Sequence, residues 1–202
     1  MRTGASVGAR PEGVSRLRKA AALAVCLAIV AAIALVTGTR GDSVPVRYAD
    51  VVVGETGAAT DFDVRVLDVR LTQQVQRDES AEPLGTDATF VVVDLTADAR
   101  RGTVNLTGDV WLLTASGHRY APRDEFGSAQ PSMVQPGFTT TGTFVFQVPP
   151  DRIAGARLLV EPGTALFVIH DTTVRVNLGL GEDAPLLAEP IMLAPSTTEV
   201  TP

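Results

Sequence analysis

The sequence contains very few of the residues that build common metal and redox sites. Of its 202 residues, one is a cysteine, Cys26, and two are histidines, His118 and His170. Zinc needs three or four nitrogen or sulfur ligands, so two distant histidines and no cysteine after Cys26 argue against a zinc site. The residues after Cys26 also cannot form a disulfide, so a domain built from them must be stable on its hydrophobic core alone.

Signatures of the common enzyme classes are missing as well. The sequence has no Walker loop, no Gly-x-Gly-x-x-Gly after a predicted strand and no Gly-x-Ser-x-Gly elbow. The remaining catalytic candidate is His170, which Asp171 could orient as in a hydrolase triad. A polar histidine at the end of a strand is the simpler interpretation. We therefore predict a chain that is not an enzyme and has no cofactor, with an envelope hydrolase using His170 and Asp171 as the alternative.

Calcium binds carboxylate and carbonyl oxygens and needs neither cysteine nor histidine. Asp61 and Asp63 share one face of a predicted strand, and Asp94, Asp98 and Asp109 are the acids that could approach them. The sequence has no EF-hand loop. Alternating aspartates usually form the solvated face of a strand, so we assign no metal ligand.

One long apolar run dominates the N-terminal region. Residues 20–36 contain no charged residue, proline or glycine. A helix of this length covers roughly 26 Å, and extending it to Thr39 brings it to about 30 Å, the thickness of a bilayer core. We predict a transmembrane helix over residues 20–39. Its insertion depends on the larger apolar side chains: Leu23, Val25, Leu27, Ile29, Val30, Ile33, Leu35 and Val36.

The flanks of this run predict its orientation. Basic residues precede it, with Glu12 as the only acid, so residues 1–19 are expected to be a cytoplasmic tail and the following domain to lie outside the cell. A signal peptide cleaved near Gly38 would instead release a secreted domain. A lipoprotein acylated on Cys26 is a third reading, but Val25 stands where a lipobox has a small residue.

The charge of the chain is divided sharply between its two parts. Residues 1–40 hold six of the 17 basic and one of the 23 acidic residues, which leaves residues 41–202 with a net charge of −11. Such a domain repels phosphate, so nucleic acid is excluded as a partner. Arginine outnumbers lysine sixteen to one amid abundant alanine, valine and glycine, as in proteins of high-GC bacteria.

After residue 40 the apolar pattern alternates as in β-strands. Within residues 61–76, the apolar face moves from even to odd positions at Val66–Leu67, which predicts a β-bulge there. The four consecutive apolar residues 90–93 predict a central strand covered on both faces. The other predicted strands cover residues 48–53, 104–106, 110–113, 118–120, 138–148, 156–160, 165–170 and 173–180.

These strands and their turns predict one domain over residues 40–181, an all-β, immunoglobulin-like antiparallel sandwich preceded by a single transmembrane helix. Residues 110–113 and 118–120 are expected to form a hairpin, with Trp111 in the core. Prolines keep residues 121–135 irregular. The polar, proline-rich residues 182–202 are expected to be a mostly disordered tail.

Residues 89–149 resemble a family of bacterial, often actinobacterial, surface proteins. The resemblance rests on the valine-rich strand 90–96, on Leu112-Leu113 followed by Gly117 and Tyr120, and on Gln135-Pro136-Gly137, Gly142 and the strand 144–149 that ends in Val-Pro. These proteins have a telokin-like, immunoglobulin-like domain of unknown function, related to the fold of the mycobacterial immunoprotective extracellular antigen. The resemblance implies the same fold and supplies no catalytic residue. Residues 99–102 depart from the asparagine-rich turn of the family, and its common lipobox is absent.

Together these observations predict a non-catalytic, membrane-anchored binding or structural module of the cell envelope. Its partner would be a protein of the envelope, and small residues in the anchor would also permit pairing with another membrane helix. Sandwiches bind through their loops, and the longest predicted loop includes a mixed polar and aromatic set. The candidate partner surface is Arg123, Asp124, Glu125 and Phe126.

Overall fold

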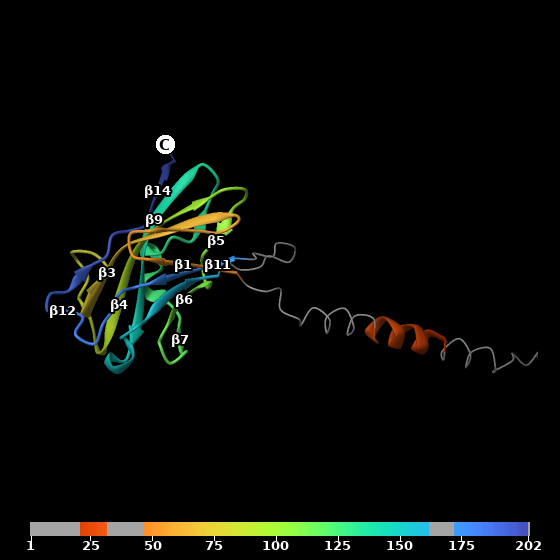
Figure 1. Ribbon diagram of the computed structural model, residues 1–202, viewed down its shortest axis with the longest axis horizontal. Helices are drawn as coiled ribbons and strands as arrows, with labels where there is room; N and C mark the ends of the chain where they lie inside the picture. Colours follow the sequence, from red (N-terminus) through yellow and green to blue (C-terminus); the bar gives the residue numbers. More distant parts are fainter. Residues whose placement is uncertain (1–20, 32–46, 162–171, 202) are drawn as a thin grey trace, which may run out of the picture. The chain divides into compact units, whose positions relative to one another are not determined.

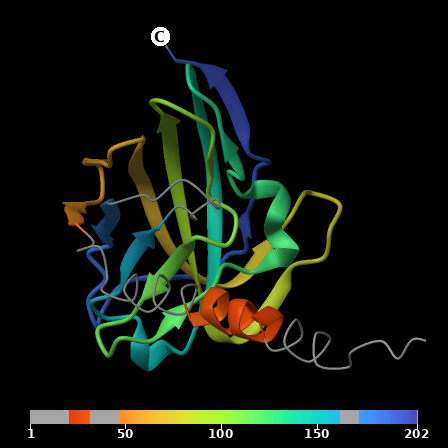
Figure 2. The same cartoon turned by 90° about the vertical axis from the view of Figure 1, so that its right-hand side faces the viewer.

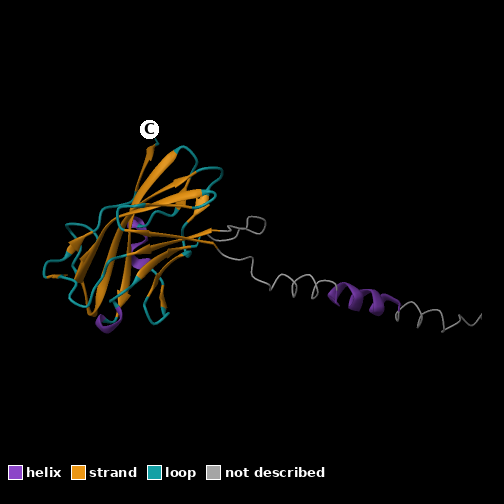
Figure 3. Cartoon of the chain, in the orientation of Figure 1, coloured by secondary structure: helices purple, strands orange, loops and turns teal. Residues whose placement is uncertain are grey.

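The computed structural model describes residues 21–31, 47–161 and 172–201. The chain divides into two compact units, residues 1–44 and residues 45–202. In the first unit, residues 21–31 are helical and their side chains are exposed. The second unit consists almost entirely of β-strands (Figure 3).

The strands of the second unit form two main sheets (Figure 1). Sheet A has the order β1-β11-β10-β6-β7, and sheet B has the path β12-β3-β4-β9-β14, with β2 and β13 also paired to β3. The strands of sheet A are β1 (Arg47–Val52), β6 (Val110–Leu113), β7 (Arg119–Tyr120), β10 (Arg157–Val160) and β11 (Thr172–Asn177). Those of sheet B are β2 (Thr56–Ala58), β3 (Phe62–Gln76), β4 (Leu84–Ala99), β9 (Phe138–Val148), β12 (Leu186–Leu187), β13 (Ile191–Met192) and β14 (Thr197–Val200). A small third sheet pairs β5 (Val104–Asn105) with β8 (Met133–Val134).

The predicted central strand is confirmed and explains the layered architecture. Strand β4 lies between β3 and β9, and Phe90, Val91, Val92 and Val93 are all buried. Val91 and Val93 face the first core, which fills the space between sheets A and B, whereas Phe90 and Val92 belong to a second core on the opposite face of sheet B. A strand buried on both faces has no polar position to alternate with its apolar ones.

The second core is covered by two segments outside the sheets. One is the 3-10 helix η1 (Asp124–Ala129), which contributes Phe126 and Ala129. The other is the C-terminal segment, which contributes Ile191 and Leu193. The prediction of a mostly disordered tail over residues 182–202, and of a domain ending at residue 181, is therefore wrong. Its few apolar residues are enough to dock it. Strands β12 and β13 pair with β3 at one edge of sheet B, and β14 pairs with β9 at the other (Figure 2 shows the C-terminal strand β14 beside β9).

The predicted β-bulge in the long strand is confirmed. The pairing of β3 with β4 shifts between Val66 and Asp68, which leaves Leu67 unpaired with its side chain 45% exposed. The inserted residue is what returns Val69 and Leu71 to the face of the first core. A second shift lies between Thr72 and Gln74, where Gln73 of β3 stands opposite the four residues 86–89 of β4. It was not predicted, because these residues are polar or small and do not interrupt an apolar pattern.

The remaining strand predictions hold in most places. The hairpin of β6 and β7 and strand β9 are confirmed. Val174, Val176 and Leu178 point into the first core. The sandwich is not wholly antiparallel, since β1 pairs in parallel with β11, and β12 and β13 in parallel with β3. The strand predicted over residues 165–170 lies outside the described residues.

Residues 121–135 were predicted as an irregular connection but contain η1 and β8. They lie against the part of strand β9 that is not paired with β14. The Arg123 amide donates to the Val145 carbonyl at 2.8 Å, and a Cβ added at Gly142 would lie 2.5 Å from the Ala129 carbonyl oxygen. Gly142 is therefore required for this segment to approach the strand.

Candidate functional site

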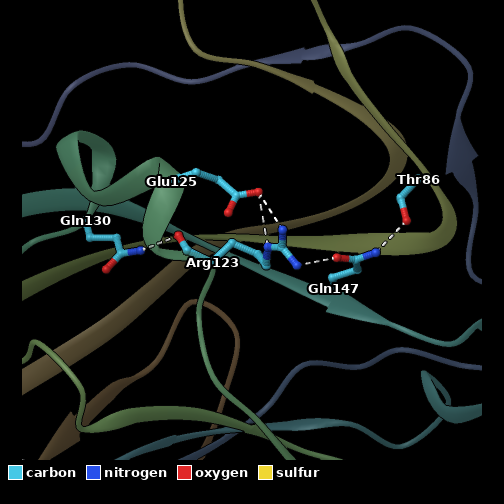
Figure 4. A network of polar contacts seen from close by, with 5 residues as sticks. All are labelled: Thr86, Arg123, Glu125, Gln130 and Gln147. Carbon is cyan, nitrogen blue, oxygen red and sulfur yellow. Dashed lines mark hydrogen bonds and ion pairs between the residues drawn. The ribbon is translucent and has the colours of Figure 1, made fainter.

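The predicted partner surface is mostly structural. Arg123 is held by an ion pair with Glu125, at 2.7 Å from Nη2 to Oε1, and Nη1 donates to the Gln147 side chain at 2.7 Å (Figure 4). Gln147 in turn donates to the Thr86 hydroxyl, and the Gln130 amide donates to the Arg123 carbonyl. This network joins η1 to strands β4 and β9.

Phe126 contradicts its assignment to an exposed surface. Its ring is buried in the second core, edge-on to Phe90 with 6.2 Å between ring centroids. The sequence places Phe126 between polar residues, which suggested a loop, but a short 3-10 helix turns this one side chain inward. Among the four predicted residues, only Asp124 is exposed.

Trp111 is also not in the core, contrary to prediction. Strand β6 alternates Val110 and Leu112, both buried in the first core, with Trp111 and Leu113, which are half-buried on the outer face of sheet A. Apolar residues on both faces of β6 hid this alternation in the sequence. The pairing register places Trp111 in one row with Leu159, Arg175 and Asp50 across four strands.

This outer face of sheet A gathers aromatic and arginine side chains. The Arg175 guanidinium lies 4.6 Å from the centroid of the Tyr48 ring, a cation–π contact. Arg175 also donates two hydrogen bonds to Asp50, one of them 2.7 Å from Nη2 to Oδ2. Arg119 pairs with Glu161 at 2.7 Å.

Two ion pairs, Arg175 with Asp50 and Arg119 with Glu161, hold charge on this face in place. The hydrogen bond from Arg175 is the main cause that lowers the pKa of Asp50, and the charges of Arg175 and Arg157 lower it further. The same hydrogen bond raises the pKa of Arg175. Within the part of the chain that the structure describes, Arg157 forms no ion pair of its own, so its guanidinium is free to meet a ligand.

A cleft of about 360 Å³ lies on this face, at the strands β1, β11 and β10. It is lined by Asp50, Val51, Val52, Glu55, Arg157, Arg175 and Asn177. Two acids and two arginines together with a nearby tyrosine form a polar, amphoteric surface. Such a surface can bind groups of either charge by hydrogen bonds and ion pairs.

A second hollow, of about 390 Å³, lies where the first core reaches one end of the sandwich. Its lining comes from β3, β4, the 3-10 helix η2 (Pro150–Arg152), residues 153–154 and residues 181–186, and combines apolar side chains with one hydroxyl and two carboxylates. The residues are Leu71, Thr89, Pro150, Asp151, Ile153, Ala154, Gly181, Glu182, Ala184 and Leu186.

The aspartates considered for calcium are engaged with other side chains. Asp63 accepts two hydrogen bonds from Arg100, Asp94 binds Arg70 and Thr143, and Asp98 accepts from Thr139. Asp61 and Asp109 also have interactions with other groups. Over residues 21–31, 47–161 and 172–201, no group of three histidines, cysteines or acids is arranged to hold a metal ion.

The two histidines lie in different parts of the chain. His118 lies in the turn between β6 and β7, where its Nδ1 is 3.0 Å from the Ser116 hydroxyl. His170 and Asp171, the alternative catalytic pair, lie outside the described residues.

The predicted membrane anchor is described only in part. Five of its large apolar residues, Leu23, Val25, Leu27, Ile29 and Val30, are exposed on the helix at residues 21–31, as is Cys26. The other three, Ile33, Leu35 and Val36, lie outside the described residues. Among the residues that are described, no helix has the length and apolar character needed to span a membrane.

Comparison with known proteins identifies a fold and no family. No family model matches the sequence, and no curated protein matches it. Among solved structures, the chain is similar to the yjhA protein from Bacillus subtilis, with 17% identity and a TM-score of 0.51 over 63% of this chain and 99% of that chain.

Two further solved structures share the likeness more weakly. One is ycdA, a candidate lipoprotein of Bacillus subtilis, with 15% identity and a TM-score of 0.44 over 60% of this chain and 38% of that chain. The other is an uncharacterized β-sandwich protein of Clostridium difficile, with 11% identity and a TM-score of 0.43 over 65% of this chain and 94% of that chain. At these identities the similarity is one of fold.

Proposed function

We propose that this chain is a non-catalytic binding module of the bacterial cell envelope that binds a protein partner through the outer face of sheet A. The observation that carries the proposal is the gathering of Tyr48, Trp111, Arg119, Arg157 and Arg175 on this one face. Tyrosine, tryptophan and arginine are the residues most enriched at the centres of protein interfaces, because each combines a large contact area with hydrogen bonding.

The exposure of the face supports the same proposal. Tyr48 is 49% exposed and Val52 is 48% exposed, although both lie on a strand of the sandwich. A protein partner would bury these side chains and would meet Arg157, which has no ion pair to break among the described residues. The net charge of −11 on residues 41–202 favours a partner with a basic rim around its contact surface.

We further propose that a single N-terminal helix anchors the module, with residues 1–19 in the cytoplasm and the sandwich outside. Support comes from the basic residues before the apolar run and from the helix at residues 21–31, whose apolar side chains are exposed on all sides. A helix that is apolar all round is suited to lipid.

The sandwich itself is proposed to be immunoglobulin-like. If β3, β4, β6, β9, β10 and β11 are taken as strands A, B, C, E, F and G, sheet B has the order A-B-E and sheet A the order G-F-C. This is the arrangement of the immunoglobulin fold, with β14 beside β9 in the place of strand D. The order supports the resemblance to actinobacterial surface proteins, which stays a proposal.

Two measurements on the native host test the anchor. We expect the full-length mass, found in the membrane pellet and resistant to carbonate extraction. A mass that begins near Thr39, found in the medium, would overturn the anchor and make the module a secreted one.

Site-specific photo-crosslinking in the native envelope tests the binding face. A photoreactive phenylalanine at Val52 lies on the outer face of sheet A, and one at Leu67 lies in the bulge of sheet B with nearly equal exposure, 48% against 45%. We expect a discrete adduct from Val52 that Arg157→Glu weakens, and none from Leu67. Equal adducts from both positions, or an adduct from Leu67 alone, would show that the partner does not bind sheet A.

A further inference from the structure

The hollow at the end of the first core has the features of a small-molecule site. Its volume of about 390 Å³ falls within the range of about 300–1,000 Å³ that is usual for ligand pockets. Leu71 and Ile153 of its lining belong to the first core, and Ala184 packs against that core. This part of the wall is therefore apolar and belongs to the sandwich itself.

Thr89 is the unusual member of the lining. Its side chain is only 3% exposed, and no described residue bonds its hydroxyl. Among the described residues the only buried side-chain polar atom without a partner is Arg70 Nε, so the Thr89 hydroxyl still reaches the solvent of the cavity. A hydroxyl that bonds only solvent can exchange its water for a polar group of a ligand. The equally buried Thr72, one strand away, shows the normal case, since its hydroxyl binds the Gln74 amide and carbonyl. The unpaired hydroxyl of Thr89 lines the cavity and is available to a ligand.

The charged members of the lining are both acids. Asp151 and Glu182 are exposed, and neither forms an ion pair with another described residue. Arg152, which follows Asp151, donates instead to the Tyr120 hydroxyl at 3.2 Å and is not part of the lining. The opening of the cavity therefore attracts cations and repels anions.

We propose that this cavity binds a short aliphatic amine that carries a second hydrogen-bonding group at its other end. The ammonium group pairs with Asp151 and Glu182, the carbon chain contacts Leu71 and Ile153, and the second group bonds the Thr89 hydroxyl. The negative charge of the domain as a whole favours the approach of such a cation. Since η2 and residues 181–186 form the site, its failure would leave the proposal for sheet A untouched.

Four water-soluble probes, each with one functional group per end, test the assignment on the full chain in detergent micelles. The probes are aminopentanol, pentylamine, pentanediol and hydroxypentanoate. Their binding is measured from the methyl NMR signals of Leu71, Ile153 and Leu186. We expect aminopentanol to bind most tightly, by about fivefold over pentylamine and at least about tenfold over hydroxypentanoate, because each lost polar contact costs roughly 1 kcal/mol. Equal affinities, or no change in these signals, would overturn the proposal.

Three variants assign the contacts. Thr89→Val is expected to abolish the preference for aminopentanol over pentylamine. The double variant Glu182→Gln, Asp151→Asn is expected to abolish the preference for aminopentanol over pentanediol. Asp183→Asn is the control, because Asp183 adjoins Glu182 and is not part of the lining. Loss of preference in the control would mean that the domain charge, and not the cavity, selects the amine. The probe series on the parent chain does not depend on any variant folding.

Discussion

Phe126 stands edge-on to Phe90 across the second core, with 6.2 Å between the two ring centroids at an angle of 90°. One ring belongs to a short 3-10 helix and the other to the central strand β4, so this contact fixes the helix to the sheet. Arg123, paired with Glu125, then lies where it reaches Gln147. The segment covers the sheet and is not a free binding loop.

Phe126→Ala is therefore expected to lower the free energy of unfolding by about 3–5 kcal/mol, the usual cost of removing a buried ring. Asp124→Ala, on the exposed side of the same helix, is expected to change it by less than about 0.5 kcal/mol. Denaturant unfolding measures both. If Phe126→Ala is as stable as Asp124→Ala, the ring is not packed as described.

The C-terminal segment is expected to be required for stability. Ile191→Ala should cost about 2–5 kcal/mol, since Ile191 is buried in the second core, whereas Met192→Ala, at the exposed neighbouring position, should cost much less. Thermal unfolding of both variants checks this. Truncation after Gly181 should lower the melting temperature further than either substitution, and an unchanged melting temperature would restore the original prediction of a disordered tail.

Because Leu67 is the inserted residue of a bulge, its deletion is expected to leave the protein folded. Removing Leu67 joins Val66 to Asp68, and these already pair with the consecutive residues Leu95 and Asp94, so the register on both sides is kept. Deleting Thr96 from the bulge-free pairing of β4 with β9 must instead turn part of β4 to the wrong face. Circular dichroism and unfolding should show a folded Leu67 deletion and an unfolded or strongly destabilised Thr96 deletion. The reverse order would contradict the observed register.

Two buried threonines of sheet B are expected to respond differently to the same substitution. Thr72→Val removes a hydroxyl bonded to Gln74, which leaves buried groups unpaired and should cost about 1–3 kcal/mol. Thr89→Val removes a hydroxyl without a partner among the described residues and should be neutral or slightly stabilising. Equal losses in urea unfolding would mean that the Thr89 hydroxyl is bonded after all.

The ion pair of Asp50 and Arg175 predicts a pH dependence. The hydrogen bond from Arg175 lowers the pKa of Asp50 in the folded state. The ion pair therefore contributes fully to the free energy of unfolding above the unfolded pKa of about 3.9, and this contribution is lost as the pH falls through the folded pKa. Both groups are partly exposed, so Asp50→Asn should cost at most about 1 kcal/mol at pH 7. Melting temperatures of variant and parent should converge in acid. Asp124→Asn, which removes no ion pair among the described residues, should show no such convergence.

The sequence predicted what depends on alternation along single strands. Four apolar residues in a row at residues 90–93 indicated a strand buried on both faces, and the change of face at Val66–Leu67 indicated the bulge. Both follow from the two-residue period of a strand, which is a local property. The parallel pairing of β1 with β11 depends on contacts between residues more than a hundred positions apart, for which no local pattern exists.

The candidate site was harder to predict for the same reason. Trp111 has apolar neighbours on both sides, so its outward direction depends on which face of β6 the rest of the sandwich covers. Phe126 was taken for a surface residue because its neighbours are polar, although one turn of 3-10 helix directs it inward. The cavity around Thr89 combines four separate parts of the chain, and no motif marks it.

The two outer strands of sheet B, β12 and β14, both come from the last twenty residues of the chain. Strands β3 and β9 therefore keep bare edges until these residues have paired with them. Exposed edges pair readily with other chains, and pairings between distant residues form slowly. A copy clipped before β12 is thus expected to aggregate, because it lacks the strands that cover the outer edges of sheet B.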